Sequence, residues 1–97
     1  MKKEKSFSEE VIENIKKIPK GKVATYGQIA AISGNHLASR QVAYILHSCT
    51  EKEGLPWHRV INSSGRISLK GEGYIIQKAL LEKEGVEFSW DDRIDLK

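Results

Sequence analysis

The sequence has a single cysteine, Cys49, and this scarcity excludes two kinds of scaffold. One thiol cannot form an internal disulfide, and no group of cysteines and histidines has the spacing of a zinc site. Long apolar runs are also absent, so no segment has the length of a membrane span. The basic start of the chain leads into a polar stretch rather than the apolar core of a secretory signal. We therefore expect no metal, no cofactor, no membrane partner and a cytoplasmic location.

The 97 residues are 39% hydrophobic and 30% charged, enough for one core and too few for two. We expect a single domain over residues 1–97, and a monomer. Residues 82–97 hold six of the 13 acidic and three of the 16 basic residues, so residues 1–81 hold seven acids and 13 bases. This asymmetry favours a polyanionic partner for the main body. Lysines that only solvate the surface would explain it equally well.

A first helix is predicted near the N-terminus. Ser6 and Glu9 have the three-residue separation of a capping box, in which each side chain bonds to the backbone N–H of the other. The apolar residues that follow recur at the spacing of one helix face: Val11, Ile12, Ile15 and Ile18. Proline and glycine at positions 19 and 21 end this helix.

Two further short helices are predicted next. Thr25 and Gln28 form a second capping box before a short apolar segment, which residues 33–35 close. Ser39 is expected to cap the following helix, on one face of which lie Val42, Ile45 and Leu46. The polar residues 48–54 are expected to form a loop. Two short helices joined by a glycine turn are typical of a helix-turn-helix, with an ordinary helical bundle as the alternative.

The C-terminal half is predicted to contain a β-hairpin and a last helix. Apolar residues 60–61 and 67–69 flank a turn-forming segment, residues 62–66, in the pattern of a hairpin. Apolar residues between positions 74 and 81 indicate a helix that ends at Gly85. Phe88 and Trp90 are expected to cover one edge of the core. The patterns together predict a mainly α fold with a small β-hairpin.

The helix-turn-helix is the first functional signal, because the second helix of such a pair can enter a DNA groove with its early side chains. These side chains are Ser39, Arg40 and Gln41. A guanidinium can bond base edges or occupy the space of an extruded base, and Arg40 begins an otherwise apolar segment. A helical bundle with a solvated arginine would show the same pattern.

Residues 55–60, with the sequence Leu-Pro-Trp-His-Arg-Val, are the second signal. They resemble the Pro-Cys-His-Arg-Val signature of O6-alkylguanine-DNA alkyltransferases, with Trp57 where the acceptor cysteine belongs, as in the alkyltransferase-like proteins. The resemblance extends from about residue 7 to residue 85. Residues 20–30 look like the start of the family's helix-turn-helix, residues 39–42 like its recognition helix, and residues 80–85 like its closing helix. Arg40 also precedes Trp57 by the family's spacing of seventeen positions.

The resemblance implies roles for individual residues. Arg40 would fill the gap left in the base stack, and Tyr26 would press on the phosphate of the flipped nucleotide and border its pocket. Trp57 would line that lesion pocket, with walls from Val60, Ile61, Asn62, Ser63 and Ser64. His58 and Glu84 would keep the positions of the family's hydrogen-bond relay. Each has a structural alternative: Tyr26 as a packed aromatic, and His58 and Glu84 as satisfied polar groups, which we favour because a relay without a thiol has nothing to activate.

The tryptophan decides the expected mechanism. An alkyl acceptor must be a nucleophile such as a thiolate, whereas an indole offers only a hydrogen-bond donor and a π-face. We therefore expect no catalytic residue in a winged-helix-like DNA-binding domain that contains a helix-turn-helix. The resemblance implies non-enzymatic binding of O6-alkylguanine in double-stranded DNA with nucleotide flipping, which marks the damage for nucleotide excision repair proteins.

Three alternatives remain open at this point. Cys49, at the position of the transferases' hinge asparagine, could be a substitute acceptor, although we expect it to lie away from the pocket floor. A winged-helix transcription regulator would bind a defined undamaged sequence. A protein-interaction domain with a decayed DNA surface would not depend on Arg40.

Overall fold

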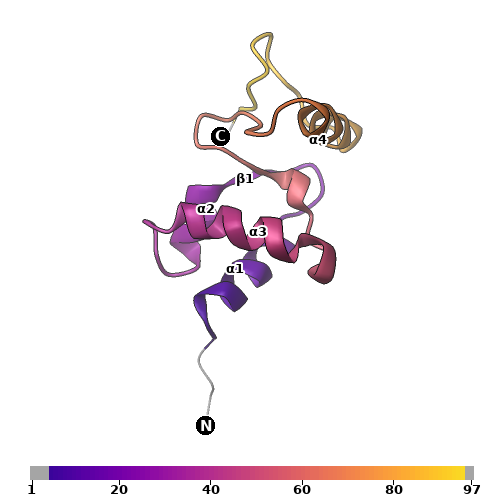
Figure 1. Cartoon of the computed structure of the whole chain (residues 1–97). Coiled ribbons are helices and arrows are strands. Elements are labelled where there is room, and N and C mark those ends of the chain that lie inside the picture. The colour runs from indigo at the N-terminus through magenta and orange to yellow at the C-terminus, as the bar shows by residue number, and fades with distance from the viewer. Residues whose placement is uncertain (1–4, 96–97) are drawn as a thin grey trace.

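The computed structural model describes residues 5–95, and helices dominate this range (Figure 1). The α-helices are α1 (Phe7–Lys16), α2 (Tyr26–Ile32), α3 (Ser39–Glu53) and α4 (Glu72–Lys83). A 3-10 helix, η1 (Trp57–Arg59), leads into β2 (Val60–Ile61), which pairs with β1 (Ala24–Thr25). None of the helices in this range combines the length and apolarity needed to cross a bilayer. The prediction of a mainly helical fold is confirmed.

Both predicted capping boxes are formed. Ser6 Oγ accepts from the amide of Glu9 at 3.2 Å, and the Glu9 carboxylate accepts from the amide of Ser6 at 2.9 Å. Thr25 and Gln28 exchange the equivalent bonds at 3.0 and 2.8 Å. Because each box satisfies two amides that a helix start leaves without partners, the positions where α1 and α2 begin are set locally.

The third helix differs from its prediction at both ends. Ala38 occupies the cap position, without a side-chain hydrogen bond, and Ser39 is already helical. At the other end, residues 48–53 continue the helix instead of forming a loop, and the hydroxyls of Ser48 and Thr50 donate to carbonyls one turn back. The helix ends at Gly54, whose φ of 64° favours glycine.

Helices α1, α2 and α3 pack together around one apolar cluster. Its buried members include the face predicted for α3 and that predicted for the first helix except Ile12, which is only partly buried. We call the buried members the N-terminal cluster: Val11, Ile15, Ile18, Ile29, Ala30, Val42, Ile45, Leu46, Leu55 and Val60. The turn between α2 and α3 spans residues 33–38, so the two helices form the predicted helix-turn-helix.

The predicted hairpin is wrong. Val60 and Ile61 pair in parallel with Ala24 and Thr25, and residues 67–69 form no strand. The segment between does turn back, since the amide of Asn62 donates to the carbonyl of Arg66 at 3.0 Å. Val60 and Ile61 are both fully buried. This is typical of a parallel strand covered on both faces, rather than of a hairpin strand with one solvent-exposed face.

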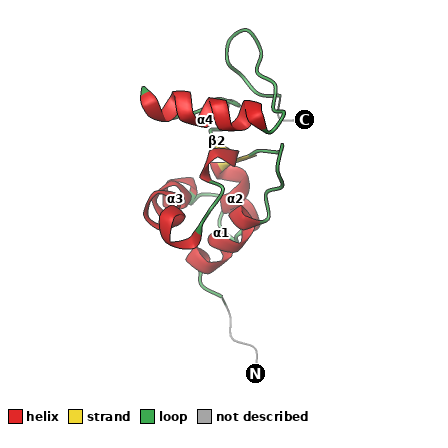
Figure 2. Cartoon of the chain, turned by 90° about the vertical axis from the view of Figure 1, so that its right-hand side faces the viewer, coloured by secondary structure: helices red, strands yellow, loops and turns green. Residues whose placement is uncertain are grey.

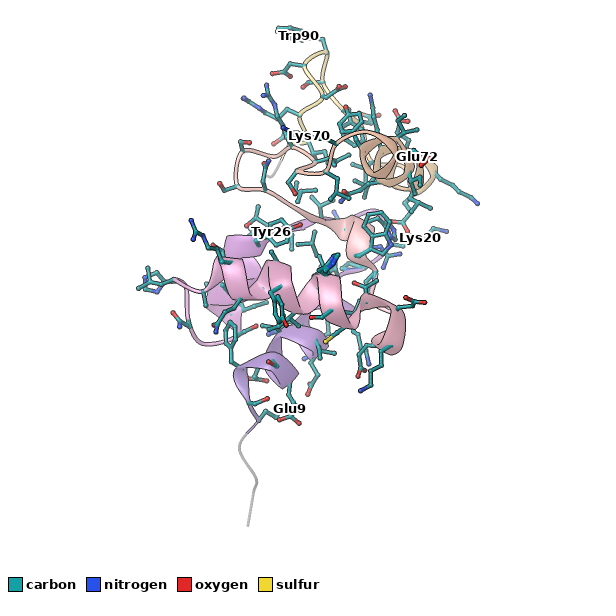
Figure 3. All side chains as sticks on the ribbon, viewed as in Figure 1. Glu9, Lys20, Tyr26, Lys70, Glu72 and Trp90 are labelled. Atoms are coloured by element: carbon teal, nitrogen blue, oxygen red, sulfur yellow. The ribbon has the colours of Figure 1, made fainter. Side chains whose placement is uncertain are left out.

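Helix α4 lies across the end of the molecule opposite α1, α2 and α3, with β2 between them (Figure 2). It packs on a second group of buried residues, the C-terminal cluster: Ile61, Ile67, Leu81, Val86 and Ile94. Of the two tail aromatics, Phe88 packs against this cluster as expected, whereas Trp90 is 96% exposed at the tip of the last loop (Figure 3). The expectation that Trp90 covers the core is therefore wrong, because the loop turns away from the core before reaching it.

Candidate nucleic-acid interface

A cavity of about 440 Å³ lies between the helix-turn-helix and α4. Tyr26, the first residue of α2, and Trp57, the first residue of η1, both line it, and Figure 3 shows Tyr26 between the lower helices and the segment leading to α4. The full lining is Tyr26, Ala43, Leu46, His47, Thr50, Trp57, Ser68, Leu69 and Gln77. Its size is within the range of small-ligand sites, and most of its wall is apolar.

Trp57 is held by its neighbours on both sides. Its indole is half-buried and packs against the N-terminal cluster, and its amide donates to the carbonyl of Leu55 at 2.8 Å. The ring of His58 meets the indole edge-on, with centroids 6.2 Å apart and an interplanar angle of 83°. A fixed indole in a cavity wall can pack against an apolar group, and it has no nucleophilic atom.

The cavity wall differs from the predicted pocket. Val60 and Ile61 are in the two buried clusters, and Asn62, Ser63 and Ser64 form the turn after β2; none of these five lines the cavity. One face of α3 and residues 68–69 take their place. The α3 residues follow the spacing i, i+3, i+4, i+7, a pattern that was readable in the sequence: Ala43, Leu46, His47 and Thr50.

The structure brings His58 and Glu84 together, with 2.9 Å between His58 Nε2 and Glu84 Oε2. Arg59, which sequence reasoning missed, also donates two hydrogen bonds to this carboxylate. Its Nε lies 3.0 Å from Oε1, and its Nη2 lies 2.7 Å from Oε2. The amide of Gly21 adds a fourth bond at 3.3 Å. These donors, Arg59 first, hold the pKa of Glu84 well below its ordinary value. Glu84 is therefore ionised at neutral pH and anchors the residues following Trp57.

Arg59 connects three parts of the chain. Besides its two bonds to Glu84 at the end of α4, its Nη1 donates to the carbonyl of Ile18 after α1 at 2.9 Å. The carboxylate raises the pKa of the guanidinium further above its ordinary value. The side chains of Arg59 and Glu84 are only 17% and 11% exposed. This network fixes the turn that carries Trp57 against both halves of the molecule.

The three residues predicted to meet DNA lie together at the start of α3. Ser39 is half-buried, whereas Arg40 and Gln41 are exposed, one step along the chain from the turn of the helix-turn-helix. Within residues 5–95, Arg40 forms no ion pair. Its guanidinium is therefore available to a partner outside the protein.

Cys49 is a partly buried residue of α3, on a different side of the helix from the cavity-lining residues. It packs against the N-terminal cluster and is not part of the cavity wall. In the same part of the chain that the structure describes, no group of three or more histidine, cysteine, aspartate or glutamate residues could hold a metal ion.

Comparisons with known proteins point to one family. The model of the family described as "6-O-methylguanine DNA methyltransferase, DNA binding domain" matches residues 6–86. A DNA base-flipping protein of Escherichia coli strain K12 is 43% identical over 97 residues, which cover 100% of this chain and 75% of that protein. Alkyltransferase-like protein 1 of Schizosaccharomyces pombe is 43% identical over 83 residues, covering 84% of this chain and 77% of that protein. The crystal structure of S. pombe Atl1 in complex with damaged DNA containing O6-carboxymethylguanine matches with a TM-score of 0.77 and 39% identity, over 94% of this chain and 88% of that chain.

Proposed function

We propose a function from one premise: this chain belongs to the family of the 6-O-methylguanine DNA methyltransferase DNA-binding domain. It binds O6-alkylguanine in duplex DNA, turns the damaged nucleotide out of the stack and holds the base without removing the alkyl group. The names of the relatives support this proposal, since one is a DNA base-flipping protein and another is an alkyltransferase-like protein solved with damaged DNA.

One observation carries the proposal: Trp57 stands in the wall of the cavity at the place where the resemblance puts the acceptor cysteine. Transfer of an alkyl group needs a nucleophile such as a thiolate, and an indole provides none. An indole does offer an apolar face to an alkyl group, so burial of both surfaces favours the alkylated base. Cys49 is no substitute, since it lies outside the cavity wall. Recognition is thus retained and transfer is lost.

Nucleotide flipping requires groups that offset the cost of unstacking, roughly a few kcal/mol. We assign the wedge to Arg40, which is exposed and free of acidic partners within residues 5–95. We assign the rotation of the phosphate to Tyr26, which lies at the N-terminus of α2 and borders the cavity. Ser39 and Gln41, beside Arg40, would contact the DNA backbone.

Repair must then be completed elsewhere, because a protein that only holds the lesion removes nothing. We propose that the bound site is passed to nucleotide excision repair proteins, as the family resemblance implies. His58 and Glu84 keep the positions that the resemblance gives to the relay. We assign them to anchoring the turn after Trp57, since the Glu84 carboxylate already accepts four hydrogen bonds.

Two variants test the assignment in gel-shift titrations with duplexes that carry one O6-methylguanine or one guanine. Arg40→Ala is expected to weaken binding at least tenfold, whereas Arg93→Ala, a matched change of an exposed arginine in the last loop, leaves it unchanged. Trp57→Ala is expected to lower the preference for the methylated duplex. Parental affinity in Arg40→Ala, or an unchanged ratio of dissociation constants in Trp57→Ala, would refute the respective role.

A further inference from the structure

A buried glutamine of α4, Gln77, lines the cavity and has no role in the function proposed above. The residue is only 2% exposed. Burying a primary amide away from water is unfavourable unless its hydrogen-bonding groups find partners. The hydrogen-bond partners of its NH2 group, and the absence of a partner for its oxygen, indicate what this residue can bind.

Both hydrogens of the Gln77 amide are used within the protein. Nε2 lies 3.0 Å from the carbonyl oxygen of His58 and 3.1 Å from that of Val60. Two carbonyl acceptors can be satisfied only by the NH2 group, so the nitrogen faces η1 and β2. The amide is thereby held in a fixed orientation on the backbone next to Trp57.

The amide oxygen is left without a donor among the described residues. A carboxamide oxygen can accept two hydrogen bonds, and neither is made by residues 5–95. No side-chain polar atom in this part of the chain is both fully enclosed and without a partner. Because Oε1 of Gln77 has no partner, it is not fully enclosed. Gln77 is otherwise buried and lines the cavity, so we infer that the cavity is the space from which a donor reaches Oε1.

The other polar residues of the cavity wall are less suited to read a base. The hydroxyl of Tyr26 is assigned to the phosphate of the nucleotide. His47 and Ser68 are exposed, so water competes for their bonds, and the hydroxyl of Thr50 already donates to the carbonyl of Leu46. An acceptor that is both buried and held in place loses little conformational freedom when it binds a donor. Leaving it unpaired in a complex costs free energy.

We propose that Oε1 of Gln77 accepts a hydrogen bond from the exocyclic 2-amino group of the purine held in the cavity. The inference rests on the proposed function and adds the group that selects the base. Guanine has N–H donors at N1 and at the 2-amine. Alkylation at O6 removes the N1 proton, so the 2-amine becomes the remaining donor of the base. Adenine has no 2-amine. Trp57 then contacts the alkyl group while Gln77 identifies the base as a guanine.

The test uses three duplexes that differ at one base: guanine, O6-methylguanine and O6-methylhypoxanthine, which keeps the methoxy group and lacks the 2-amine. The parent protein is expected to bind O6-methylguanine about tenfold more tightly than O6-methylhypoxanthine, as expected for one buried hydrogen bond. Gln77→Met, of similar shape and without the amide, should bring this ratio close to one. Glu82→Met, which changes an exposed residue of the same helix outside the cavity wall, should leave the ratio at the parental value.

The outcomes separate the inference from the function on which it rests. If the parent prefers O6-methylguanine over guanine but binds O6-methylhypoxanthine equally well, Gln77 does not read the 2-amine and the proposed function stands. If Gln77→Met weakens both methylated duplexes equally and keeps their ratio, the residue only supports the backbone beside Trp57, which also overturns the inference. If the parent binds guanine and O6-methylguanine equally, the proposed function fails and the inference fails with it. A parental ratio of O6-methylguanine to O6-methylhypoxanthine affinity near one refutes the inference even if Gln77→Met does not fold.

Discussion

Replacement of Arg59 by methionine should destabilise the protein more than any change of a surface ion pair. Methionine keeps most of the aliphatic stem and removes the two bonds to Glu84 and the bond to the carbonyl of Ile18. Removing one partner of a buried ion pair costs about 3–5 kcal/mol. Glu84 is 11% exposed and keeps its bonds from His58 and Gly21, so we expect a smaller loss, of about 2–3 kcal/mol.

Urea unfolding at pH 7, followed by far-UV circular dichroism, measures this loss. It corresponds to a decrease in the thermal midpoint of about 10–20 °C for a domain of this size. Arg66→Met is the matched control, because the Arg66 side chain is 46% exposed and makes one ion pair, with Asp91; it should cost less than about 1 kcal/mol. Equal free energies of unfolding for the two variants would refute the view that Arg59 joins the two halves of the molecule.

Two further predictions concern the same network. The pKa of Glu84 lies below its ordinary 4.5 in the folded state, so its contribution to stability is complete above that pH and is lost as the pH falls. The free energy of unfolding should therefore decrease more steeply between about pH 5 and pH 2 in the parent than in Glu84→Gln, and parallel pH profiles from urea titrations would contradict this. Gly21→Ala should cost about 1–2 kcal/mol, because Gly21 has a φ of 85° and a Cβ there would lie 3.1 Å from the carbonyl oxygen of Glu84. Gly27→Ala is the control in thermal unfolding and should not be destabilised, because Gly27 is in α2 and a Cβ there would meet only Thr25 Oγ1, at an ordinary contact distance of 3.9 Å.

Much of the fold could be predicted because its determinants are local. The capping boxes at Ser6 and Thr25 lie within four residues of chain, and the apolar spacing of α1 and α3 directly identified their buried faces. The second half of α3 was mistaken for a loop because Ser48 and Thr50 are common in loops. Their hydroxyls bond to the preceding turn of the helix instead, which composition cannot reveal.

The pairing of β2 with β1 could not be predicted, because it joins residues far apart in the chain and depends on burial from both sides. The residues of the site likewise fall into those that could be predicted from the sequence and those that could not. Trp57 and Tyr26 were found through a motif and do border the cavity. Arg59 and Gln77 were missed, because their importance comes from bonds to Ile18, η1 and β2 that form only when distant segments meet.

The central claim, binding of an alkylated base without transfer, is tested most directly on the parent protein. The intrinsic fluorescence of the protein, which includes that of Trp57, is titrated with two duplexes that are identical except for one O6-methylguanine, and the intact mass of the protein is then measured. We predict tighter binding of the methylated duplex and an unchanged protein mass. Equal binding of both duplexes, or a methyl-sized gain in mass, would contradict the account.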